Sequence, residues 1–266
     1  MKVYISGDIE GITGTTNWNE TEKNLPDWEQ FAKQMTKEVS AAAKGALLAG
    51  ADKIIIKDAH DSGRNINMDE LPEEVELIRG WTGDPLSMMA GIDETFDAAI
   101  FIGYHNGADT ISNPLSHTMS TSEVLNVKLN GECISEFILN AYAAALFDVP
   151  VVFVSGDKGL IEKVKEVNSN IVTLGVKDGV GGATINMHPK KAVKETEELV
   201  KKSLSEGVES KKIKLPERFD LEIEYKDHKS AYRYSFYPGA EYKSPRTVIF
   251  KTEKYYEILR IIHFLT

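Results

Sequence analysis

The chain has 266 residues, enough for one large α/β domain or for a main domain with an appendage. Its net charge of -10 comes from interspersed acidic and basic residues, without the basic stripe that binds nucleic acid or an anionic membrane surface. The single cysteine, Cys133, excludes an intramolecular disulfide, and no apolar run approaches the ~18 residues of a membrane helix, so we expect a cytoplasmic protein.

Strands and helices alternate along the first two-thirds of the chain. Short β-branched or apolar runs predict strands at residues 2–6, 53–57, 75–78, 98–102, 124–129, 151–155 and 171–176. Apolar periodicity predicts helices at residues 27–50, 134–147, 158–167 and 189–205, with a short one at 86–89. Asp27 and Gln30 have the spacing of a capping box, and Asn130-Gly131 is typical of a hairpin turn. This alternation predicts an α/β fold, a mostly parallel sheet flanked by helices.

The composition changes after Gly207. Lysine and glutamate become more frequent, and short strand-like segments occur at residues 221–225 and 248–250, before a final helix at 254–264. We therefore expect an α/β metal-binding catalytic core at residues 1–207 and a smaller C-terminal α+β unit at residues 208–266 packed on it.

Asp8 and Glu10 follow the first strand, one residue apart. Side chains two positions apart on an extended backbone point the same way, so both carboxylates face one space. Two adjacent carboxylates remain ionised together only when a cation lies between them. Gly7, Gly11 and Gly14 allow the backbone to fold tightly around such a cation.

Histidines follow two further strands. His60 comes after the strand at 53–57, and His105 after the strand at 98–102. In an open α/β sheet, ligands bind beyond the carboxyl ends of the strands, so these side chains converge with Asp8 and Glu10. Each residue alone would more often have a structural role; their convergence favours a metal site. Two carboxylates and two imidazoles fill one tetrahedral zinc, and a bridging carboxylate with one more acid allows two metals.

Two further residues complete the candidate site. Glu136, at the start of the helix after the hairpin, is one of many acids that could supply the extra ligand. His117, in the loop after His105, is better interpreted as an acid–base group than as part of a serine-hydrolase pair, because no G-x-S-x-G motif is present.

These residues carry a resemblance to the DppA-type D-aminopeptidases, which are zinc-dependent bacterial peptidases. The shared motifs are Asp8-Ile9-Glu10-Gly11-Ile12-Thr13-Gly14, Asp58-Ala59-His60, Gly103-Tyr104-His105, Ser116-His117, Glu136 with Leu139-Asn140-Ala141-Tyr142, and Gly156-Asp157. The resemblance covers the first ~160 residues strongly and the remainder weakly. Ala59 replaces the family's common serine, and the stretch at residues 15–25 is divergent, which leaves the substrate open.

The resemblance implies an enzyme that hydrolyses small peptides with an N-terminal D-residue, such as D-Ala-D-Ala. It implies that His117 is catalytic and that Asp8 bridges two zinc ions, whose ligands are Asp8, Glu10, His60, His105 and Glu136. It also implies a ring-like homodecamer. Two alternatives stay open at this point: a dimetal amidase or other small-molecule hydrolase with a different substrate, and a non-catalytic binding or scaffold protein.

Overall fold

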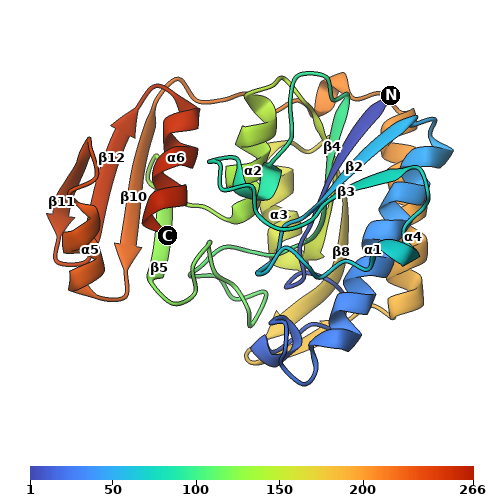
Figure 1. The fold of residues 1–266 in the computed structure, drawn as a ribbon, viewed down its shortest axis with the longest axis horizontal. Helices are drawn as coiled ribbons and strands as arrows, with labels where there is room; N and C mark the ends of the chain where they lie inside the picture. Colours follow the sequence, from blue (N-terminus) through green and yellow to red (C-terminus); the bar gives the residue numbers. More distant parts are fainter.

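A computed structural model describes all 266 residues. Its larger part is a seven-stranded sheet in the order β3-β2-β1-β4-β7-β8-β9 (Figure 1). The strands are β1 (Lys2–Gly7), β2 (Lys53–Asp58), β3 (Val75–Ile78), β4 (Ala98–Tyr104), β7 (Val151–Asp157), β8 (Val172–Val180) and β9 (Ala183–Asn186). All neighbours pair in parallel except β8 and β9. The predicted fold class, a mostly parallel sheet flanked by helices, is confirmed.

Helices cover both faces of this sheet. They are α1 (Trp28–Leu48), α2 (Glu136–Ala145), α3 (Lys158–Val167) and α4 (Pro189–Ser205), with 3-10 turns η1 (Trp18–Glu20), η2 (Met68–Glu70), η3 (Ser87–Met89) and η4 (Glu209–Lys211). In Figure 1, α1 and α4 lie side by side on one face, and α2 lies on the other. Strand β1 is buried on both sides, because Val3 and Ile5 enter one core cluster and Tyr4 enters the other. No helix combines the length and the apolar character that crossing a bilayer requires.

A second, antiparallel sheet has the order β11-β12-β10-β5-β6. Its elements are β5 (Val124–Leu129), β6 (Glu132–Cys133), β10 (Phe219–Tyr225), β11 (Ala240–Ser244) and β12 (Thr247–Thr252), with helices α5 (His228–Tyr234) and α6 (Tyr255–Leu265). Helix α6 faces α2, where the Tyr255 hydroxyl donates to the Leu139 carbonyl at 2.7 Å. The division at residues 207 and 208 stays a prediction; the C-terminal sheet also takes in the β5–β6 hairpin.

Local predictions differ from the structure at two helix starts. The capping box at Asp27 is wrong: Asp27 has helical backbone angles and no side-chain cap, because a turn already precedes α1. A capping box forms instead at Asn17 and Glu20. Helix α2 begins at Glu136 rather than at residue 134, because the Ile134 amide still bonds to Val127 of the hairpin.

Candidate metal centre

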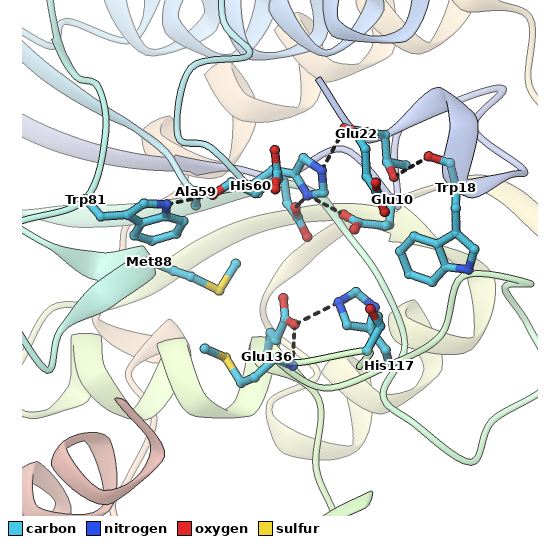
Figure 2. A pocket seen from close by; sticks show the side chains of 14 residues that line it. Glu10, Trp18, Glu22, Ala59, His60, Trp81, Met88, His117 and Glu136 are labelled. Carbon is cyan, nitrogen blue, oxygen red and sulfur yellow. Dashed lines mark hydrogen bonds and ion pairs between the residues drawn. The ribbon is translucent and has the colours of Figure 1, made fainter. Parts of the chain in front are cut away.

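The predicted ligands meet at one edge of the main sheet. Strand β1 lies between β2 and β4, so the loops that follow these three strands are neighbours. The first carries Asp8 and Glu10, the second His60 and the third His105. Glu136, the first residue of α2, points toward the same space (Figure 2). These side chains are buried.

Close backbone contacts hold the Asp8–Glu10 loop in place. The Gly11 amide donates to the Gly103 carbonyl at 2.8 Å, and a Cβ on Gly11 would lie 1.7 Å from the Tyr104 carbonyl oxygen. No residue with a side chain fits at position 11, where this loop crosses the end of β4. From β8, the buried Lys177 ammonium donates to the carbonyls of Glu10 and Thr15. The loop therefore depends on a lysine that sequence reasoning missed.

Asp8 faces two histidines at once. Its Oδ1 lies 3.3 Å from His60 Nδ1, and its Oδ2 lies 3.6 Å from His105 Nε2. Glu10 Oε2 lies 3.0 Å from His60 Nδ1, and Glu136 Oε2 lies 3.4 Å from His105 Nε2. The cluster thus has two halves, with the Asp8 carboxylate between them.

Each histidine has one ring nitrogen engaged by a backbone carbonyl. His60 Nε2, His105 Nδ1 and His117 Nδ1 each lie 2.9 Å from a carbonyl oxygen, of Thr21, Asn106 and Leu115 respectively. A carbonyl only accepts, so the engaged nitrogen carries the proton and the other nitrogen is left to bind. This arrangement is typical of histidines that ligate a metal.

The cluster fits a cation. Three of its buried side-chain atoms lack a hydrogen-bond partner: Asp8 Oδ2, Glu10 Oε2 and His105 Nε2. Burial and the neighbouring Glu10 raise the pKa of Asp8 to about 8. Burial opposes the charge on His105, but the carboxylates of Glu136 and Asp8 raise its pKa to about 10. The carboxylates and imidazoles together are a donor set for zinc.

His117 lies beside the second half of the cluster. Its Nε2 is 3.5 Å from Glu136 Oε1, and its ring stacks on His105 with centroids 4.4 Å apart. Burial, and secondly the nearby His105, lower the pKa of His117. Possible ligand atoms form two groups, one from Asp8, Glu10 and His60 and the other from His105, His117 and Glu136. This geometry allows His117 to act as a ligand or as an acid–base group.

The cluster opens into a cavity of about 260 Å³. The side chains that line it are Asp8, Glu10, Trp18, Thr21, Glu22, Ala59, His60, Asp61, Trp81, Met88, His117, Met119, Thr121 and Glu136 (Figure 2). The divergent stretch at residues 15–25 supplies three of these residues, and its Thr21 carbonyl also orients His60. Trp81 and Met88 carried no signal in the sequence, because neither is a metal-ligating residue type and neither follows one of the strands that deliver the predicted ligands.

Comparisons with known proteins point to one family. A family model described as Peptidase_M55, D-aminopeptidase, matches residues 1–264. A curated D-aminopeptidase of Bacillus subtilis (strain 168) is 31% identical over 250 residues, which are 94% of this chain and 90% of the relative. The solved structure of the Zn-dependent D-aminopeptidase DppA from Bacillus subtilis, described as a self-compartmentalizing protease, matches with a TM-score of 0.92 and 30% identity. That match covers 100% of this chain and 96% of the other.

Proposed function

This chain belongs to the M55 peptidase family of D-aminopeptidases, and from that premise we propose that its buried cluster binds two zinc ions and cleaves peptides that begin with a D-residue. The protein is a metal-dependent D-aminopeptidase, so the alternatives of a different small-molecule hydrolase and of a non-catalytic scaffold are set aside. The number of metal ions, the ligand roles and the substrate D-Ala-D-Ala are our proposals.

One observation carries the two-metal proposal: the two oxygens of Asp8 face different histidines. Glu10 and His60 would hold one ion, His105 and Glu136 would hold the other, and Asp8 would contribute to both. The unpartnered atoms of Asp8, Glu10 and His105 support this assignment. Zinc lowers the pKa of a bound water and polarises a carbonyl, which is the chemistry that peptide hydrolysis requires.

We assign acid–base catalysis to His117. Its Nδ1 proton bonds to the Leu115 carbonyl, so Nε2 is free to accept the proton that the attacking water gives up in the cavity. Burial lowers the pKa of His117, which favours the neutral ring, and Glu136 Oε1, 3.5 Å away, favours the charged ring once the proton has been accepted. The proton then passes to the leaving amine nitrogen.

Two experiments test these assignments. The first compares hydrolysis of D-Ala-D-Ala and L-Ala-L-Ala with and without added zinc; turnover of the L-peptide alone would contradict the proposal. The second measures bound zinc and turnover in His117→Ala. An acid–base residue leaves zinc content at the wild-type level while turnover falls by ~10²–10⁴-fold. Loss of zinc in this variant would make His117 a ligand.

We also propose that the protein works as a homo-oligomer, a decamer by family resemblance, in the cytoplasm. Exposed aromatic side chains on the C-terminal unit, including Tyr232 and Phe236, support an assembly surface. Light scattering of the purified protein tests the decamer, and a monomer at micromolar concentration would refute it. Cell fractionation tests the location.

A further inference from the structure

A second cavity of about 240 Å³ adjoins the metal cavity. Trp81, Met88 and Met119 line both, so these three side chains lie where the two cavities meet. Figure 2 shows Trp81 and Met88 on the side of the metal cavity opposite Trp18. A molecule bound at the metal ligands can therefore extend past these three side chains into the second cavity.

The second cavity is largely apolar. Leu86, Leu139, Leu259 and Ile262 line it, and its ionisable side chains are Asp84 and His263. No lysine or arginine lines either cavity. The carboxylate of a short peptide therefore finds no guanidinium or ammonium partner there, whereas an apolar side chain finds the surface that it needs.

The wall between the two cavities is held in place from the main core. The Met88 carbonyl accepts a hydrogen bond from Ser6 Oγ at 3.0 Å, and the Met88 sulfur accepts one from Asn140 Nδ2 at 3.2 Å. Asn140 also donates to the Tyr104 hydroxyl at 3.0 Å. Strand β1 and helix α2, which lead to Asp8 and Glu136, thus fix Met88 relative to the metal ligands.

Charge decides which end of a peptide enters which cavity. Two carboxylates in the metal cavity, those of Glu22 and Asp61, are not assigned to zinc, and the second cavity has one side-chain carboxylate, that of Asp84. The free ammonium of an N-terminal residue is therefore attracted to the metal cavity. The following residue then lies toward Trp81 and Met88.

We propose that the second cavity is the subsite for a large apolar side chain on the residue after the scissile bond. This inference rests on the proposed aminopeptidase function and adds to it a preference for the leaving residue. The preference arises because burying a phenyl or isobutyl group among these side chains favours binding.

The test compares kcat/KM of the zinc-loaded enzyme on D-Ala-Gly, D-Ala-L-Phe and D-Phe-Gly. We expect D-Ala-L-Phe to exceed D-Ala-Gly by roughly tenfold or more. Leu86→Asn makes the cavity polar and Thr266→Trp fills it, so each reduces this ratio to about threefold or less. Leu48→Asn, at an exposed leucine on α1, is the matched control and keeps the wild-type ratio.

Two outcomes overturn the inference while the enzyme is active: equal rates on D-Ala-Gly and D-Ala-L-Phe, or a preference for D-Phe-Gly that both substitutions abolish. Binding of L-phenylalanine amide, measured by calorimetry against glycine amide, needs no turnover. If no peptide is cleaved, the proposed function is refuted. Binding of L-phenylalanine amide that Leu86→Asn and Thr266→Trp both weaken would still support the subsite. Absence of that binding refutes the subsite.

Discussion

Replacing Lys177 with methionine should weaken the metal centre without touching a ligand. Lys177 is fully enclosed, and its ammonium donates to the carbonyls of Glu10 and Thr15. Methionine fills a similar volume but cannot donate. Asn113 Nδ2 also donates to the Glu10 carbonyl at 3.0 Å, so the change leaves only the Thr15 carbonyl without a partner. A buried carbonyl without a partner costs about 1–3 kcal/mol, and we expect the metal-free protein to lose about that much unfolding free energy.

The same change should lower zinc affinity. The Thr15 carbonyl loses its partner and the Glu10 carbonyl keeps only Asn113 Nδ2, so the loop that carries Glu10 is held less firmly. Residues that orient a metal ligand typically contribute ~10–100-fold to affinity. Urea unfolding of the metal-free protein measures the stability, and competition with a chromophoric chelator measures the affinity. Lys158→Met is the matched control, because Lys158 is an exposed lysine on the adjacent α3 whose ion pair with Asp178 spans 3.3 Å. Zinc affinity of Lys177→Met within about threefold of the control would refute the reasoning.

Three further predictions concern these loops and Glu38 of α1, which accepts a hydrogen bond from the Thr13 amide at 3.1 Å. Asp8→Asn should retain no zinc while Glu10→Gln retains one ion, as counted by atomic emission after dialysis; one ion in Asp8→Asn would contradict the bridge. Gly11→Ala should cost more than ~3 kcal/mol in thermal unfolding, because its methyl group collides with the Tyr104 carbonyl; wild-type stability would show that the loops can separate. Burial raises the pKa of Glu38 to about 7. The contribution of Glu38 to the free energy of unfolding is therefore complete below pH ~4.5 and is lost as the pH rises to about 7. Glu38→Gln should therefore match the wild type near pH 5 and exceed it by about 1–3 kcal/mol at pH 8 in urea unfolding, and equal stability at pH 8 would refute this.

Much of the fold was predictable because its elements have strong local signals. Ile54-Ile55-Ile56 and the charged run after Pro189 form the expected strand and helix. The hairpin turn was also predictable, since Asn130 and Gly131 both adopt the positive φ that such a turn requires. Strands β9 and β11 were not foreseen, because these segments are short and largely exposed, and contain few apolar residues.

The residues of the candidate site also divide into those that the sequence could place and those that it could not. Asp8, Glu10, His60 and His105 follow strand ends, and parallel strands deliver their carboxyl ends to one edge, so their meeting could be argued from order along the chain. Glu136 and His117 come from a helix start and a loop, where only the family resemblance selected them. The contacts of Lys177 and the cavity lining by Trp81 depend on pairings across the fold that no local pattern encodes.

The sequence by itself determined the chemistry available here: carboxylates and imidazoles after successive strands, and glycines where two loops cross. Tertiary structure decided how these groups are oriented. It turns one oxygen of Asp8 toward His60 and the other toward His105, and it brings Leu259 and Ile262 of α6 to the second cavity. The physical reason is that residue type and spacing fix what a side chain can bind, whereas the packing of distant segments fixes which side chains face one another.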